Sequence, residues 1–144
     1  MTLHLVKLAV GVDDVDHLAR VQQRRRTEAI RAGRGDRLWH LTRNAPRRAD
    51  ELLDGGSIYW VVKGRIRVRQ RLLAIESDVD EEGRRFCRLV LHPTLVETEA
   101  VFHRAIQGWR YLSASDAPPD QRKGGGDGGL PAGLAEELRD LGLL

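Results

Sequence analysis

The sequence predicts an α+β fold: a small mixed sheet, strongly curved or partly closed into a β-barrel, with two helices and a flexible C-terminal tail. Three observations lead to this fold class. The chain has 144 residues, 41% of them hydrophobic, which is enough for one domain with a buried core. The expected elements come in the order β-α-β-α and are followed by a run of about four or five strands. Glycine, proline and aspartate separate these elements.

Strands are predicted where β-branched, aromatic and other apolar residues form short runs or alternate with polar ones. The predicted strands are residues 3–10, 38–43, 57–62, 65–75, 86–91, 95–102 and 107–112. A first helix is expected after Asp13 and Asp14, because either carboxylate can cap its first turn. A second, short helix is expected to start at Asn44-Ala45-Pro46, since proline suits the first helical turn.

The chain is expected to divide into three parts. Residues 1–120 form a single α+β domain. Residues 121–129 read QRKGGGDGG, a composition typical of a flexible linker. Residues 130–144 form a short amphipathic helix, with Leu134, Leu138 and Leu141 on one face. An isolated helix this short is marginal in water, so we expect it outside the core.

The stretch 51–75 contains a predicted central hairpin. With a two-residue loop of Lys63 and Gly64, Trp60 lies opposite Arg67 and shares a face with the arginines of the second strand. The core face then carries Tyr59, Val61, Ile66 and Val68. A three-residue loop would exchange the faces, because one residue of slip turns every side chain over.

Three alternate residues of the second strand, Arg65, Arg67 and Arg69, are expected to project from one face about 6–7 Å apart. This spacing suits the phosphates of an extended single strand, and Trp60 would add base stacking. The competing interpretation is a solvated charged face that binds nothing. In that case the arginines pair with Glu97, Glu99 or the acidic turn 78–82.

Charge is unevenly distributed along the chain, although the net charge is only +3. Residues 20–71 contain 15 Lys and Arg against 5 Asp and Glu, a net charge of +10, so the remainder carries −7. This polarity predicts one positive and one negative surface, and it favours a polyanionic partner.

The single cysteine, Cys87, cannot form an internal disulfide and lies in an apolar run, which fits a packed thiol in a reducing compartment. No apolar run is long enough to span a membrane. The N-terminus lacks the basic region and cleavage site of a signal peptide. We therefore expect a cytoplasmic protein without a membrane partner.

No motif for a catalytic site or a metal site is present, and neither a metal nor a cofactor is expected. Polar residues predicted to converge near one end of the sheet are His40, Thr42, Arg43, Arg48, Lys63, Arg67 and Gln70. His40 is the best candidate for a functional histidine, although a structural role in its strand is favoured. Gln70 falls on the apolar side of its strand, where its amide either reads a base edge or satisfies a backbone group at a bulge. Trp109 and Tyr111 are expected mainly in the core.

Several separated blocks carry a resemblance to a known family. They are Lys7-Leu8-Ala9-Val10-Gly11, His40-Leu41-Thr42-Arg43 with Pro46 and Arg48, Glu51 through Gly64, Arg69-Gln70-Arg71, and Gln107-Gly108-Trp109-Arg110-Tyr111-Leu112. In these blocks, within residues 3–120, the chain resembles an uncharacterised bacterial family, a domain of unknown function. The linker and the C-terminal helix lie outside this resemblance, and the family brings no established activity.

At the level of fold, the order of elements also resembles PUA-like domains, including the ASCH group. This resemblance implies binding of RNA or modified nucleotides and, in a few members, hydrolysis of modified nucleosides. No residue motif supports a catalytic role, so no catalytic residue is assigned.

We therefore expect a nucleic-acid-binding module, for RNA, that uses the basic face of the hairpin. Its expected contact residues are Arg43, Arg48, Trp60, Lys63, Arg65, Arg67, Arg69 and Gln70, with His40 and Thr42 in a pocket. The alternative is a small enzyme acting on a modified nucleotide or another anionic small molecule, with Thr42, Lys63 and Glu51 as polar participants. A third alternative is a protein-interaction domain that uses two charge poles. The oligomeric state is left open.

Overall fold

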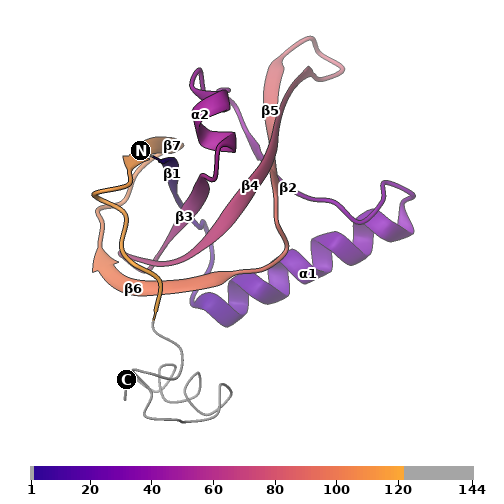
Figure 1. Ribbon diagram of the computed structural model, residues 1–144. Coiled ribbons are helices and arrows are strands. Elements are labelled where there is room, and N and C mark those ends of the chain that lie inside the picture. The colour runs from indigo at the N-terminus through magenta and orange to yellow at the C-terminus, as the bar shows by residue number, and fades with distance from the viewer. Residues whose placement is uncertain (1, 122–144) are drawn as a thin grey trace.

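The computed structural model describes residues 2–121, which form one mixed seven-stranded sheet and two helices (Figure 1). The strands are β1 (Leu3–Leu8), β2 (Leu38–Thr42), β3 (Ser57–Val62), β4 (Arg65–Val79), β5 (Arg85–Leu91), β6 (Val96–Phe102) and β7 (Trp109–Ser113). The helices are α1 (Val15–Arg31) and α2 (Ala49–Leu53). The α+β class and the predicted order of elements are confirmed. Residues 122–129 of the predicted linker and the predicted helix 130–144 lie outside the described residues.

The sheet is open, so the predicted partial closure into a β-barrel is wrong. The strand order is β2-β5-β4-β3-β1-β7, and β6 pairs with β4 outside this path. The β1–β3 pair is parallel, whereas the other pairs are antiparallel. Strand β4 explains the open shape, because its first part pairs with β3 and β6 and its second part pairs with β5. The β4–β5 hairpin therefore projects away from β1, β3 and β7 (Figure 1).

Helix α1 begins where the sequence predicts. The Asp14 carboxylate accepts a hydrogen bond from the N–H of His17 at 2.7 Å, which satisfies one of the free donors of the first turn. Val15 and Leu18 are buried in the same core cluster as Trp60, so α1 covers the sheet face that carries this indole. The remaining buried residues of the helix are Gln22 and Ala29.

Helix α2 begins later than predicted, at Ala49, and Pro46 is buried in the irregular segment before the helix. Leu52 is fully buried and anchors this short helix. The N–H of Gly56 donates a hydrogen bond to the Leu52 carbonyl at 2.8 Å and ends the turn. A Cβ on Gly56 would overlap the carbonyl oxygens of Leu52 and Leu3, so only glycine fits at this position without a shift of the backbone.

The two-residue loop of the central hairpin is confirmed. Val62 pairs with Arg65 across the loop, and Val61 pairs with Ile66. The loop residues Lys63 and Gly64 have φ values of 51° and 81°, and two positive φ values are what the tightest hairpin turn needs.

A β-bulge then shifts the register between Trp60 and Val61. Trp60 lies opposite Val68, so the prediction that it faces Arg67 is wrong. The indole is only 2% exposed, because α1 covers this face of the sheet.

The bulge also separates the arginines of β4. Arg65 is opposite Val62, whereas Arg69 is opposite Tyr59, which points to the other face of β3. Directly opposed residues share a face, so Arg65 and Arg69 lie on opposite faces of the sheet. The prediction that Arg65, Arg67 and Arg69 project from one face is therefore wrong.

All six residues of β3 are buried, because apolar clusters cover both of its faces. The larger cluster, beneath α1, contains Trp60 and Val68. The smaller cluster contains Val6, Tyr59, Val61, Ile66 and Leu112. The predicted core face is thus correct for Tyr59, Val61 and Ile66, but the bulge moves Val68 to the other cluster.

Candidate functional site

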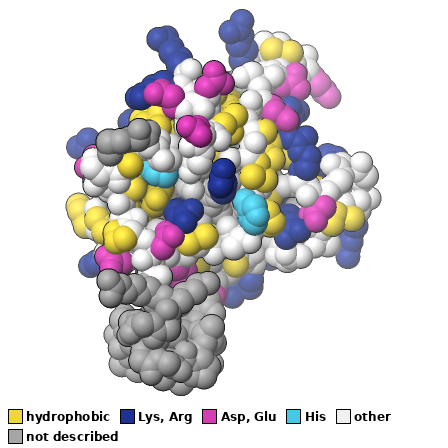
Figure 2. Space-filling model, viewed as in Figure 1, with side chains coloured by type: hydrophobic (Ala, Val, Ile, Leu, Met, Phe, Trp, Pro, Cys, Tyr) yellow, Lys and Arg dark blue, Asp and Glu magenta, His cyan; other side chains and the backbone are white. Residues whose placement is uncertain are grey.

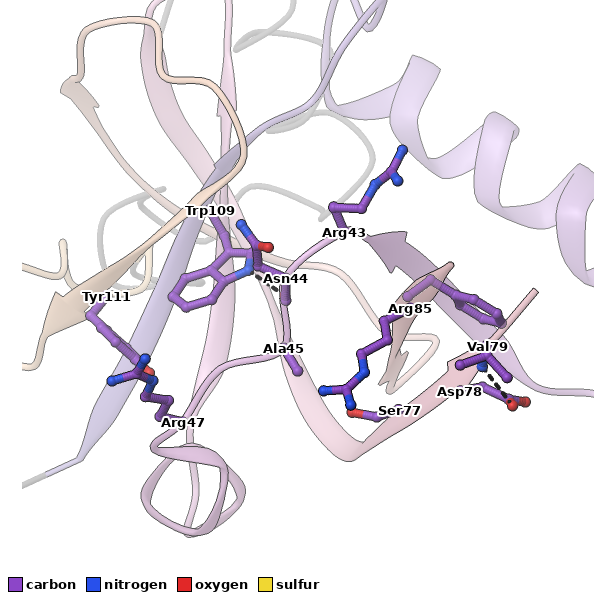
Figure 3. A pocket seen from close by; sticks show the side chains of 11 residues that line it. Arg43, Asn44, Ala45, Arg47, Ser77, Asp78, Val79, Arg85, Trp109 and Tyr111 are labelled. Carbon is purple, nitrogen blue, oxygen red and sulfur yellow. Dashed lines mark hydrogen bonds between the residues drawn. The ribbon is translucent and has the colours of Figure 1, made fainter. Parts of the chain in front are cut away.

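A groove of about 810 Å³ lies between segments that are distant in sequence. The loop between β2 and α2, together with β7, forms one wall, and the β4–β5 hairpin forms the other (Figure 3). The charged and aromatic residues that line it are Arg43, Arg47, Asp78, Arg85, Phe86, Trp109 and Tyr111. Grooves that combine basic and aromatic side chains are typical of proteins that bind single-stranded nucleic acids.

The Asn44 carbonyl holds the first wall together. It accepts hydrogen bonds from the Trp109 indole Nε1 at 2.9 Å and from the Thr42 hydroxyl at 3.0 Å (the bond to Trp109 is drawn in Figure 3). The bond from Trp109 ties the loop after β2 to β7, which is not a neighbour of β2 in the sheet, and the bond from Thr42 holds the loop to the end of β2. The wall is therefore formed by the protein's own hydrogen bonds.

Tyr111 is the most solvent-exposed aromatic residue of this wall, with 37% of its surface exposed. Its hydroxyl accepts a hydrogen bond from the backbone N–H of Arg48 at 3.1 Å, and the Arg48 guanidinium lies 5.5 Å from the ring centre. Trp109 packs edge-on against Tyr111, with ring centres 5.0 Å apart. Trp109 contacts the core partly, but the prediction that Tyr111 is mainly a core residue is wrong.

Arg43, Arg47 and Arg85 give the groove its positive charge. All three are exposed, and within residues 2–121 none of their side chains forms an ion pair or a hydrogen bond. Asp78 is the carboxylate among the lining residues, and Arg88 partly neutralises it at 3.2 Å. The N–H of Val79, then Arg88, lowers the pKa of Asp78.

The arginines of β4 have different environments. Arg69 forms a two-pronged ion pair with Asp120, with both N–O distances at 2.7 Å, and a 3.1 Å hydrogen bond to the Ser57 hydroxyl. The bond to Asp120 raises the pKa of Arg69 and lowers that of Asp120. Arg65 is exposed and Arg67 is half-buried, and neither lines the groove.

Gln70 is completely buried and uses its full hydrogen-bonding capacity inside the protein. Its amide oxygen accepts from the Trp60 indole at 2.9 Å and from the Gln22 amide at 2.8 Å. Its amide nitrogen donates to Gln22 at 2.8 Å and to the carbonyl of His92 at 3.0 Å. Of the two alternatives for Gln70, the structure supports internal satisfaction of polar groups.

The other predicted polar residues do not converge on one place. Lys63 forms an ion pair with Asp13 at 3.3 Å, and Arg48 pairs with Glu51. His40 lines a separate cavity beneath α1, and Thr42 is not part of that lining. Of the predicted contact residues, Arg43 lines the groove and Arg48 supports its wall.

Sequence reasoning did not assign Arg47, Arg85, Phe86, Trp109 and Tyr111 to a binding site. Trp109 and Tyr111 are two residues apart on a short strand, so they share a face. Arg110 lies between them, on the other face of the strand together with Leu112. This alternation was the available signal for an exposed aromatic pair.

Basic and acidic side chains are mixed on the face shown in Figure 2. Lys and Arg occur at several separate places, with Asp and Glu among them (Figure 2). Ion pairs also join basic and acidic side chains of different segments, such as Arg26 with Asp36 at 2.9 Å and Arg37 with Glu76 at 2.8 Å. The predicted separation into one positive and one negative surface is not seen on this face.

Two further properties concern the described part of the chain. Within residues 2–121, no helix combines the length and the apolar character needed to cross a membrane. In the same range, no group of three or more His, Cys, Asp or Glu side chains is arranged to hold a metal ion.

A family model described as "Protein of unknown function (DUF1489)" matches residues 5–144. The match continues past residue 120, so it includes the linker and the C-terminal segment that the resemblance in the sequence blocks left out. No curated protein and no solved structure matches the chain. Because the family model covers nearly the whole sequence, the chain belongs to the DUF1489 family, whose function is unknown.

Proposed function

We propose that this protein binds single-stranded nucleic acid, RNA, in the groove between β7, the loop after β2 and the β4–β5 hairpin. The observation that carries the proposal is a groove with three arginines that have no ion-pair partner within residues 2–121, beside the aromatic rings of Phe86, Trp109 and Tyr111. Side chains with uncompensated positive charge attract phosphates, and aromatic faces accept bases of any sequence.

The arginines and the aromatic rings would contribute to binding in different ways. Arg43, Arg47 and Arg85 would contact phosphates and release counterions, so the logarithm of affinity should fall with the logarithm of salt concentration with a slope of about −2 for three contacts. Phe86 and Tyr111 would stack on bases, at roughly 1–3 kcal/mol per base.

The order of elements resembles that of PUA-like domains, which favours RNA over DNA as the partner. A cytoplasmic location fits this partner and the single free cysteine. The basic hairpin remains the competing location for the same activity. Its support is weaker, because Trp60 is buried and Asp120 already occupies Arg69.

Two variants with the same net charge separate the two locations. The groove variant is Arg43→Gln/Arg47→Gln/Arg85→Gln. The matched control is Arg65→Gln/Arg67→Gln/Arg71→Gln, which removes three β4 arginines that do not line the groove. Binding to a fluorescent single-stranded RNA of about 12 nucleotides is measured by anisotropy at two salt concentrations.

The groove variant should bind at least tenfold more weakly, a loss of about 1.4 kcal/mol, and show a shallower salt dependence. The control variant should bind as the wild type does. The reverse result would move the site to the hairpin. Equal, weak binding by all three folded proteins would end the nucleic-acid proposal, and stronger binding to DNA of the same sequence would overturn the choice of RNA.

A further inference from the structure

A second cavity, of about 150 Å³, lies between α1 and the sheet, beyond the end of β1. It shares no lining residue with the groove. Val12, Leu18, Trp60 and Leu91 contribute apolar walls, and polar side chains enter from three elements. A cavity of about 150 Å³ is the size that holds a benzene ring in a protein interior.

Lys7 brings a positive charge to this cavity. It is half-buried on β1, next to Trp60 of β3 in the parallel register. Loss of hydration lowers the pKa of Lys7. Its ammonium forms no ion pair or hydrogen bond with any other residue in the range 2–121. A desolvated ammonium normally has an anionic partner, and the described residues supply none for Lys7.

The side chains of Arg25 and His40 also line this cavity. Arg25 of α1 also has no ion pair in the described part of the chain. His40 of β2 packs edge-on against Trp60, and its buried Nε2 has no hydrogen-bond partner among residues 2–121. Burial, together with the charges of Lys7 and Arg25, lowers the pKa of His40 to about 4, so the ring is neutral at pH 7.

The lining contains no Asp or Glu, so no described carboxylate of the cavity balances Lys7 and Arg25. The charges of Lys7 and Arg25 add to the effect of burial in lowering the pKa of His40. An anion placed between these groups would satisfy the two charges, and an apolar body attached to it would fill the space against Trp60 and Leu18.

We propose that the cavity between α1 and the sheet binds a small organic acid, with its carboxylate at Lys7 and Arg25 and an apolar body of about one ring against Trp60. The size of the cavity limits the apolar part of the acid to about one ring, and the two cations favour a negatively charged ligand. This site is independent of the groove, so either proposal can fail without the other.

Matched pairs of acid and amide test the proposal on the wild-type protein. The probes are benzoate and 3-methylbutanoate, each compared with its neutral amide of nearly the same shape. Trp39 and Trp60 line the cavity, so binding is followed by tryptophan fluorescence. Binding should be saturable for at least one acid and at least tenfold weaker for its amide. The bound acid should also raise the midpoint of the His40 titration measured by NMR.

Two variants locate the charge. Lys7→Met keeps an unbranched side chain, one atom shorter, and removes the charge, so it should weaken binding of the acid at least tenfold. Arg24→Gln is the matched control, because Arg24 is an exposed arginine of α1 that does not line the cavity. It should bind as the wild type does. If Lys7→Met does not fold, the comparison of acid and amide on the wild-type protein still tests the proposal. Absence of saturable binding by either acid, or equal binding of acid and amide, overturns the proposal.

Discussion

Gln70 of β4 and Gln22 of α1 form a reciprocal pair of side-chain hydrogen bonds, each 2.8 Å long, between the helix and the sheet. The pair lies in the buried layer that also contains Trp60, whose indole donates to the Gln70 oxygen at 2.9 Å. A satisfied polar group in an apolar layer fixes the position of the helix, because apolar contacts alone do not specify one register. The amide pair thus links α1 to β4 at one defined point, beside the apolar contacts of Val15 and Leu18.

Replacing Gln70 by leucine should destabilise the protein by roughly 2–4 kcal/mol, because the indole N–H of Trp60 and the Gln22 amide lose their partner in a buried place. Urea unfolding measures the change. Gln23→Leu, at an exposed position of the same helix, is the control and should change stability by less than about 0.5 kcal/mol. The double variant Gln22→Leu/Gln70→Leu should lose less than the sum of the single variants, and strict additivity would contradict the pairing.

Gly56 and Gly55 are adjacent but should respond differently to alanine. A Cβ at Gly56 meets backbone oxygens that cannot move aside, so Gly56→Ala should cost about 4 kcal/mol or more. Gly55 has a φ of 85° and open space around it, so Gly55→Ala should cost only the backbone strain of about 1–2 kcal/mol. Thermal unfolding of the two variants gives the comparison. A Gly56→Ala protein as stable as Gly55→Ala would show that the chain can shift at this point.

Cys87 is fully buried in β5, and burial raises the pKa of its thiol. A thiol reagent should therefore label the native protein slowly, at a rate that follows unfolding, and label the protein in urea at once. Ser115→Cys/Cys87→Ser places a single thiol at an exposed position and should react rapidly in the native state. Rapid labelling of native wild type, at the rate of this control, would contradict the burial.

Much of the fold was predictable because its signals are local. The cap at Asp14, the two-residue loop at Lys63-Gly64 and the strand that fills 57–62 depend on residues close in sequence. The bulge beside Trp60 was not predictable, because it arises where β4 pairs with β3 on one side and β6 on the other. One extra residue on β4 was enough to divide its arginines between two faces, whereas Trp60 is buried because α1 covers its face of the sheet.

The groove was less predictable than the fold. Arg43 was identified from sequence, but its neighbours Arg85 and Tyr111 come from the far end of the β4–β5 hairpin and from β7. Their proximity depends on the open sheet and on the Asn44 carbonyl, which accepts from Trp109 across the loop. Long-range contacts of this kind are set by tertiary packing and leave no periodic pattern in the sequence.

The stability of the protein should depend on pH through His40. Its pKa is lowered from 6.5 to about 4 in the folded state, so between these pH values the unfolded chain binds more protons than the folded one. Stability should therefore be unaffected by His40 above pH 6.5, fall as the pH decreases toward 4, and stop falling below that. The total change is at most about 3 kcal/mol, at 1.36 kcal/mol per pKa unit.

Urea unfolding between pH 7 and pH 4 for wild type and His40→Leu isolates this contribution. Burial and then Arg69 also lower the pKa of His4, so part of the pH dependence should remain in the variant. Leu41→Gln, at the exposed neighbouring position of β2, is the control and should keep the full dependence of the wild type. A pH profile of His40→Leu that is parallel to the wild-type profile would show that His40 takes up a proton equally in both states. In that case the His40 Nε2 could be protonated in the folded protein as easily as in the unfolded chain.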